Sequence, residues 1–164
     1  MHIVLPASLA LLFLSSPPGA AAAGQAPAAG AAPASRAPAL DKQAWYFNEK
    51  IEKQFGYASA VRVGDTLHVS GVPGAGDMAS AMQRVYKGIS AVLAAHGLDF
   101  RHVVKETLFA TNIDAVVANM EVRKGFYQGE TPAASWVQVE RLVMPQAVLE
   151  VEVTAVFPKA GGSK

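Results

Sequence analysis

Cysteine is absent from the 164 residues of this sequence, and its absence excludes several kinds of protein. A disulfide framework, a thiolate metal site, a cysteine nucleophile and a lipid-modified cysteine anchor all need that residue. An excess of charge of one sign is also lacking, because 14 basic and 13 acidic residues give a formal net charge of +1. Such a chain has no basic field for nucleic acid and no acidic tail. We therefore expect no nucleic-acid partner.

Charged side chains are missing from the first 35 positions, and Arg36 is the first. Within this part, residues 3–14 are almost wholly apolar, but a membrane-spanning helix needs roughly 20 such residues. The length is typical of the apolar region of a secretory signal, and residues 21–23 are alanines that suit cleavage. The start, Met1-His2, departs from the pattern because it contains no Lys or Arg. We predict a cleavable signal over residues 1–23 and a periplasmic or secreted protein without a membrane partner.

Large side chains are lacking in the segment that follows. Residues 20–35 contain ten alanines, two glycines and two prolines, which cannot offset the entropy of ordering. We predict a flexible linker over residues 24–44, one domain over residues 45–158 and a flexible tail over residues 159–164. The domain is long enough to bury a core.

Two segments of this domain have helical periodicity. The first starts at Met78, and Gly97 is suited to a left-handed cap at its end. Its apolar residues recur in steps of four and three at Met78, Met82, Val85, Ile89 and Val92. The second helix is predicted over residues 115–127, with Asp114 as its N-cap.

Five segments are predicted to be strands. Residues 58–63 and 66–70 form a hairpin closed by Gly64-Asp65, and residues 103–111 read as a strand with both faces covered. Residues 135–142 and 147–157 alternate in polarity, and in the last segment Glu150 and Glu152 share the polar face. The order of elements predicts the α+β class, a mixed β-sheet with two helices packed on one face.

Signals for metal or phosphate binding are weak. His96 and His102 are not spaced as metal ligands, and we interpret them as surface or edge residues. The glycine-rich residues 71–76 include Pro73 and have no following Lys-Ser/Thr, so a bend between strand and helix is favoured over a phosphate loop. We expect no metal site and no cofactor.

The pair Glu150 and Glu152 is open to two interpretations. Both carboxylates lie on one sheet face, which is either an ordinary solvated surface or the wall of a cavity or subunit contact. In the second alternative, burial would raise the pKa of one carboxyl group, which could then exchange protons with water near neutral pH.

Several motifs together resemble the YjgF/Rid family of reactive-intermediate (enamine/imine) deaminases over about residues 57–157. They are VSG at 69–71, HGL at 96–98, VKETLF at 104–109, Asn119, PAASWVQVERL at 132–142 and LEVE at 149–152. The resemblance implies a chorismate-mutase-like α+β fold and a homotrimer with pockets in the clefts between subunits. A trimer would cover the face that carries Glu150.

The resemblance also implies roles for individual residues. Tyr57 matches a pocket tyrosine and Gly71 a glycine whose backbone approaches the ligand. Asn119 matches a polar residue on a helix, and Glu150 matches the acid that handles water or a proton. The loop before Glu150 is one residue longer than the pattern, so Glu152 stays an alternative for that acid.

Two positions depart from the deaminase pattern. Where deaminases carry the Arg that binds the substrate carboxylate, this chain has Ala134, and affinity for a small imino acid is expected to fall by one or two decades or more. Two residues later, where Cys is frequent, stands Trp136, which either fills the pocket or forms a flat wall for a larger ligand. Arg141 is not expected to substitute, because its place in the strand alternation differs from that of Trp136.

Three functions follow from the resemblance. The first is hydrolysis of enamines or imines to carbonyl compounds and ammonia, and the second is a non-catalytic trimer that binds a small ligand or acts as a chaperone-like factor. Endoribonuclease activity, the third, is disfavoured by the nearly neutral charge.

Overall fold

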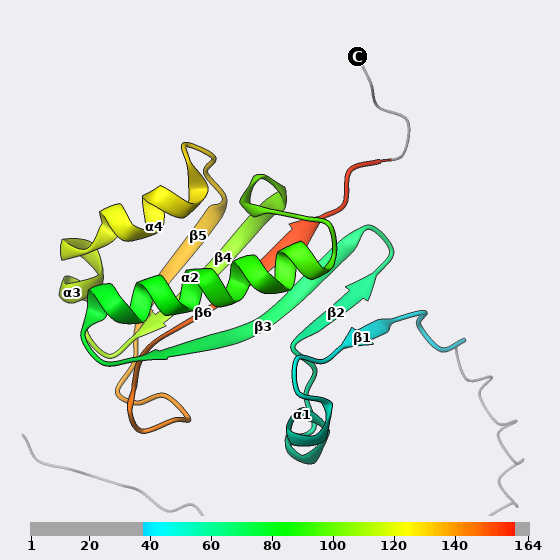
Figure 1. The fold of residues 1–164 in the computed structure, drawn as a ribbon, viewed down its shortest axis with the longest axis horizontal. Coiled ribbons are helices and arrows are strands. Elements are labelled where there is room, and N and C mark those ends of the chain that lie inside the picture. Colours follow the sequence, from blue (N-terminus) through cyan, green and yellow to red (C-terminus); the bar gives the residue numbers. More distant parts are fainter. Residues whose placement is uncertain (1–37, 160–164) are drawn as a thin grey trace, which may run out of the picture. The chain divides into compact units, whose positions relative to one another are not determined.

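A six-stranded mixed sheet is the central element of the computed structural model, which describes residues 38–159 (Figure 1). Its strand order is β1-β2-β3-β6-β4-β5, in which β4 and β5 are parallel and the other neighbours antiparallel. The strands are β1 (Gln43–Trp45), β2 (Ala60–Val63), β3 (Thr66–Ala75), β4 (Val103–Ala110), β5 (Ala133–Gln138) and β6 (Ala147–Val156).

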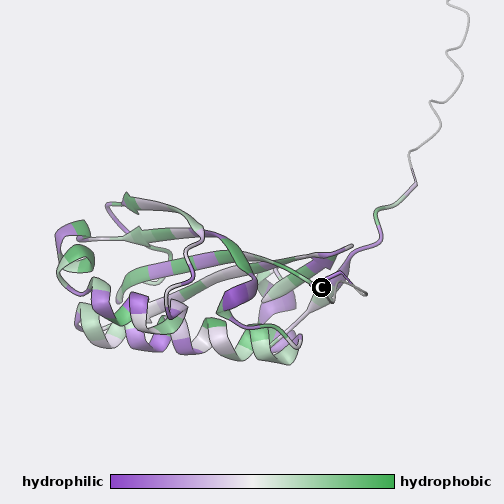
Figure 2. Cartoon of the chain, turned by 90° about the horizontal axis from the view of Figure 1, so that it is seen from above, coloured by the Kyte–Doolittle hydropathy of each residue, from purple (hydrophilic) through white to green (hydrophobic). Residues whose placement is uncertain are grey.

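Helices cover one face of this sheet, as the separate layers in Figure 2 show. The long helix α2 runs across β3 and β6, while α3 and α4 lie near β5 and α1 lies at the end that carries β1 (Figure 1). The helices are α1 (Glu49–Phe55), α2 (Met78–Ala95), the 3₁₀ turn η1 (Phe100–His102), α3 (Ile113–Ala118) and α4 (Met120–Tyr127). None of these helices is long and apolar enough to cross a membrane. The predicted α+β class, with a mixed sheet and helices on one face, is confirmed.

The core forms between α2 and the central strands because both elements have one apolar face. The helix buries residues at the predicted spacing, namely Met78, Met82, Val85, Ile89 and Val92. Every second residue of β6 faces them, namely Leu149, Val151, Val153 and Ala155. Gly97 has the predicted left-handed backbone, with a φ of 71°. The hairpin through Gly64 and Asp65 is also confirmed, since Val63 pairs with Thr66.

The predicted second helix was wrong in its start and its continuity. Asn112, not Asp114, is the N-cap, and its side chain accepts a hydrogen bond from the Ala115 N–H at 3.0 Å. The helix is interrupted at Asn119, which ends α3 and precedes α4. The φ of Asn119, −113°, departs from helical backbone, so the segment forms two short helices instead of one.

The glycine-rich segment also differs from its prediction. Residues 71–75 continue β3 instead of forming a bend, and only Gly76, with a φ of 90°, precedes the N-cap Asp77. Strand β5 ends at Gln138, short of the predicted residue 142. Strand β4 buries alternate residues and leaves Lys105, Thr107 and Phe109 half-buried on the face away from the helices, so within residues 38–159 that face is not fully covered.

Two elements at the start of the domain were not predicted. Strand β1 begins at Gln43, within the range interpreted as linker, and pairs with β2. Helix α1 follows, capped by the Asn48 side chain. The predicted signal over residues 1–23 lies outside the described residues.

Candidate functional site

A β-bulge in β3 brings Gly71 beside Glu150 of β6. Between the pairs Val69–Val153 and Val72–Val151, two residues of β3 face one residue of β6. A β-carbon at position 71 would overlap Oε1 of Glu150 and lie 2.8 Å from its Cδ. Only glycine therefore leaves room for the carboxyl group in this position.

Burial changes the acidity of Glu150. The side chain is partly buried on the sheet face away from the helices, and burial, with a smaller contribution from the neighbouring Glu152 charge, raises its pKa above the ordinary 4.5. Glu152 is more exposed and contacts a shallow hollow lined by His68, Lys105 and Thr154. Of the two acids, Glu150 has the environment of a proton-transfer group.

A mainly apolar cavity of about 410 Å³ lies on the other side of Gly71, between α1, α2 and β3. Tyr57 and Gly71 both line it, whereas Glu150 is not among its lining residues. Polar groups are contributed by Asn48, Glu52, Ser59 and Ser70. Glu52 is a structural group, because its carboxylate accepts hydrogen bonds from the backbone N–H groups of Asn48 at 2.6 Å and Ser59 at 2.8 Å.

The remaining predicted residues lie together elsewhere, around β5 and α4. Ala134 and Trp136 are on the helix face of β5, because their partners in β4 are the buried residues Glu106 and Leu108. Asn119 lies at the start of α4, and its amide donates a hydrogen bond to the Ala115 carbonyl at 2.8 Å. The predicted site residues therefore form two groups, one with Gly71 and one with Trp136.

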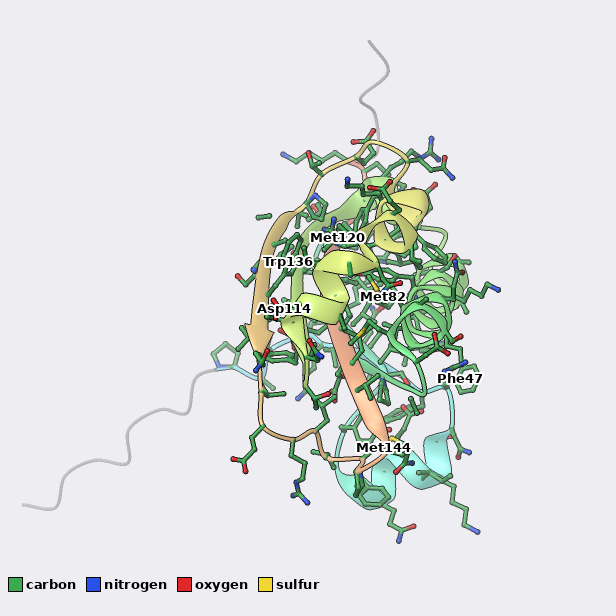
Figure 3. All side chains as sticks on the ribbon, turned by 90° about the vertical axis from the view of Figure 1, so that its left-hand side faces the viewer. Phe47, Met82, Asp114, Met120, Trp136 and Met144 are labelled. Atoms are coloured by element: carbon green, nitrogen blue, oxygen red, sulfur yellow. The ribbon has the colours of Figure 1, made fainter. Side chains whose placement is uncertain are left out.

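These two groups are separated within one protomer. Strands β6 and β4 lie between β3 and β5, which places the groups about 14 Å apart at the usual strand spacing. In Figure 3, Trp136 and Phe47, which lines the cavity, lie toward opposite sides of the view.

Sequence reasoning missed a buried polar cluster behind Trp136. Glu106 of β4 is fully buried and accepts four hydrogen bonds. The donors are Arg123 Nε at 2.8 Å and Trp136 Nε1 at 3.3 Å to Oε1, and the hydroxyls of Tyr86 at 3.0 Å and Tyr127 at 2.7 Å to Oε2. Burial and the Glu106 charge raise the pKa of both tyrosines, which therefore stay protonated donors. The only signal in the sequence was the charged residue Glu106 inside the segment 103–111, which was predicted to be a strand.

His96 and His102 make local hydrogen-bond contacts. His96 Nδ1 is 2.9 Å from the Val92 carbonyl, and His102 Nδ1 is 3.0 Å from Oδ1 of Asp99. Residues 38–159 contain no group of three or more His, Cys, Asp or Glu side chains arranged to hold a metal ion.

The fold agrees with what is found among known proteins. Residues 47–157 match the family model described as endoribonuclease L-PSP. The Myxococcus xanthus protein DfrA is 40% identical over 81 residues, which are 49% of this chain and 61% of DfrA. The 2-iminobutanoate/2-iminopropanoate deaminase of Rattus norvegicus is 32% identical over 117 residues, and the match covers 64% of this chain and 85% of the deaminase.

Solved structures show the same architecture. Rv2704 of Mycobacterium tuberculosis, a YjgF/YER057c/UK114 family member, superposes with a TM-score of 0.65 at 27% identity and covers 70% of this chain and 98% of its own. A putative endoribonuclease of Thermotoga maritima gives a TM-score of 0.59 at 31% identity, and the match covers 62% of this chain and 87% of the endoribonuclease. The chain belongs to the endoribonuclease L-PSP family, the YjgF/Rid proteins.

Proposed function

We propose that this protein is an exported homotrimeric hydrolase that converts imines or enamines to carbonyl compounds and ammonia. The observation that carries the proposal is the placement of the Glu150 carboxyl group against Gly71, a residue that with Tyr57 lines the cavity. A partly buried acid with a raised pKa is suited to proton exchange with water. The deaminase names of relatives such as the Rattus norvegicus protein support the same reaction.

The reaction needs only water and one acid–base group. Glu150 takes a proton from water as the water oxygen bonds to the C=N carbon, and the C=N electron pair moves to nitrogen. Glu150 then returns the proton to nitrogen, which gives a carbinolamine. Glu150 next takes the proton of the carbinolamine hydroxyl and passes it to the amino group, so that the C–N bond breaks, ammonia leaves and the carbonyl forms. Each step conserves atoms and charge without a cofactor.

Replacing Glu150 with glutamine is expected to lower imine turnover by about 10²–10⁴-fold, the usual contribution of a general acid–base group. The assay measures keto acid and ammonia released from imines that an amino-acid oxidase generates in situ. Glu152→Gln is the matched control, because it removes a carboxylate from the same sheet face two residues away and should change turnover only a few-fold. As base, Glu150 must be deprotonated, so wild-type kcat/KM should fall with decreasing pH through a pKa above 4.5.

Two results would contradict this assignment. If the two glutamine substitutions lowered turnover equally, Glu150 would not be the acid–base group of the reaction. Absence of turnover by the wild type on small and bulky imines alike would leave the non-catalytic, ligand-binding alternative.

Homotrimer formation is supported by the surface of β5. All six of its residues are exposed in the single chain, including Trp136 and Val137. Contact with a second subunit would cover them and could bring the residues around Gly71 of one protomer next to those around Trp136 of another.

Sedimentation equilibrium should give three times the protomer mass, and Val137→Lys should reduce this mass. Leu40→Lys, a change at an exposed leucine that precedes β1, the strand at the other edge of the sheet from β5, should not. A monomeric wild type would contradict the trimer.

Export is the part of the proposal that depends on residues outside the described range. The apolar run and the small residues before position 24 support a cleaved signal. N-terminal sequencing of protein from the cell envelope should find a start near Gly24, and an intact Met1 would count against cleavage.

A further inference from the structure

We propose that the cavity between α1, α2 and β3 binds a small organic ammonium ion, with its apolar body in the cavity and its charge beside the carboxylate of Glu52. The ligand class is a primary amine that carries an aromatic or aliphatic group. The inference goes beyond the proposed hydrolase, because it concerns binding at Glu52 of α1 and requires no turnover.

The charge of the cavity wall is the first observation. Among the described residues that line the cavity, Glu52 is the only one with a charged side chain. Its carboxylate also forms no salt bridge within residues 38–159, where all the ion pairs involve other acids. Buried charges in proteins are ordinarily paired. The wall therefore holds a negative charge that no cationic side chain of this part of the chain balances.

Glu52 is ionised and held in place before any ligand arrives. The residue is only 3% exposed, and burial raises the pKa of its carboxyl group. The hydrogen bonds from Asn48 and Ser59 outweigh burial and bring the pKa below the ordinary 4.5. Their backbone N–H groups carry no net charge, so they fix the carboxylate without neutralising it. A carboxylate has about four acceptor sites, and it can therefore also accept N–H donors from a ligand.

This arrangement favours a cation for an energetic reason. Folding has already removed the carboxylate from water, so an ammonium ion that binds there meets a desolvated and oriented partner. The attraction between the two charges is also stronger at such a site than in bulk water. A ligand carboxylate in the same place would instead be repelled by the charge of Glu52.

The rest of the cavity suits an apolar body. Its volume of about 410 Å³ is in the range of small-molecule pockets, and its walls include Val72 of β3 and Val92 of α2. Phe47, Ile51 and Tyr57 also line it, although all three are exposed. A ligand that covers these side chains removes apolar surface from water, and aromatic rings attract cations. An ammonium ion with an aromatic group matches both properties of the cavity.

Isothermal titration calorimetry with three ligands of one skeleton tests the inference at pH 7 and low ionic strength. We expect 2-phenylethylammonium to bind saturably. In 2-phenylethanol a neutral hydroxyl replaces the ammonium group, and its binding should be about 10- to 100-fold weaker, the usual difference for a charge-assisted hydrogen bond. In 3-phenylpropanoate a carboxylate replaces it, and this ligand should bind most weakly.

Glu52→Gln should weaken the binding of 2-phenylethylammonium by about 10- to 100-fold and leave that of 2-phenylethanol within a few-fold. The substitution removes the charge and keeps one acceptor oxygen. A damaged cavity would weaken both ligands, so this comparison separates the charge from a structural role. Glu49→Gln is the matched control, because Glu49 is an exposed acid of α1 that pairs with Lys53 at 2.6 Å, and it should leave both Kd values unchanged.

Ala91→Leu tests the location of the site without altering the contacts of Glu52. Ala91 is an exposed residue of α2 that lines the cavity, so a leucine there would occupy part of the space. It should weaken the binding of 2-phenylethylammonium and 2-phenylethanol to the same extent. Ala94→Leu is its control, because Ala94 is also exposed on α2 but is not among the lining residues, and both Kd values should stay unchanged.

The inference would be overturned by a wild type that does not bind 2-phenylethylammonium, or that binds the alcohol or the carboxylate as tightly. An unchanged Kd for the ammonium ion in a folded Glu52→Gln variant, or in Ala91→Leu, would overturn it as well. If Glu52→Gln does not fold, the three ligands and Ala91→Leu still decide. None of these results contradicts the hydrolase, which Glu150→Gln tests through turnover.

Discussion

Replacing Glu106 with alanine is expected to lower the free energy of unfolding by about 3–5 kcal/mol, the usual cost of breaking a buried ion pair from one side. The carboxylate is fully buried, and its removal leaves the Arg123 charge without its partner. The hydroxyls of Tyr86 and Tyr127 lose their acceptor at the same time. Because small domains are stable by only about 5–15 kcal/mol, this change should bring the protein close to unfolding.

Urea denaturation at a fixed protein concentration measures this effect. Glu121→Ala is the matched control, because Glu121 is an exposed acid of α4 that pairs with Lys124 at 2.7 Å. An exposed pair of this kind contributes at most about 1 kcal/mol. Glu106→Gln keeps one acceptor oxygen and should fall between the two. Equal stability of the Glu106→Ala and Glu121→Ala variants would show that the cluster contributes nothing.

Replacing Gly71 with alanine is expected to reduce imine turnover by about 100-fold or more, as loss of a positioned acid–base group does. The added β-carbon would overlap Oε1 of Glu150, so the carboxyl group must turn away. The backbone of Gly71 does not have the positive φ that would strain alanine, and the effect therefore acts through Glu150. Steady-state kinetics with imines generated in situ measure the loss.

Gly125→Ala is the control for this substitution. A β-carbon there meets no heavy atom within 4 Å, and alanine in a helix is favoured over glycine by up to about 1 kcal/mol. Turnover should stay unchanged. If the loss acts through the acid, Gly71→Ala combined with Glu150→Gln should be no slower than Glu150→Gln alone. Additive losses in the double variant would show that the effect of Gly71 does not act through Glu150. Turnover of Gly71→Ala within two-fold of the wild type would show the same.

The elements that the sequence predicted well are those with one buried face. Helix α2 and strand β6 were located almost to the residue, because their apolar residues recur at the period of the element. Helix α1 was missed for the opposite reason, since its apolar residues Ile51 and Phe55 are both exposed. It is fixed instead by the Asn48 cap and by the carboxylate of Glu52, whose contact with Ser59 no local pattern reveals.

The candidate site could be predicted residue by residue but not assembled. Strand alternation placed Glu150 on the correct face, and family matching indicated Tyr57 and Gly71, which the cavity brings together. The cluster around Glu106 depends on hydrogen bonds between residues 17 to 30 positions apart. Periodicity describes single elements, so it could not reveal that Arg123 of α4 pairs with Glu106 of β4.

The outer edge of β5 has a consequence for handling the protein. This strand pairs only with β4 in the described sheet, and its sequence AASWVQ contains none of the charged residues or prolines that commonly protect a sheet edge. Its unpaired backbone groups are a template onto which a strand of any other copy can add. Concentrated protein should therefore be prone to aggregate through this edge, and a lysine at its centre should suppress that aggregation.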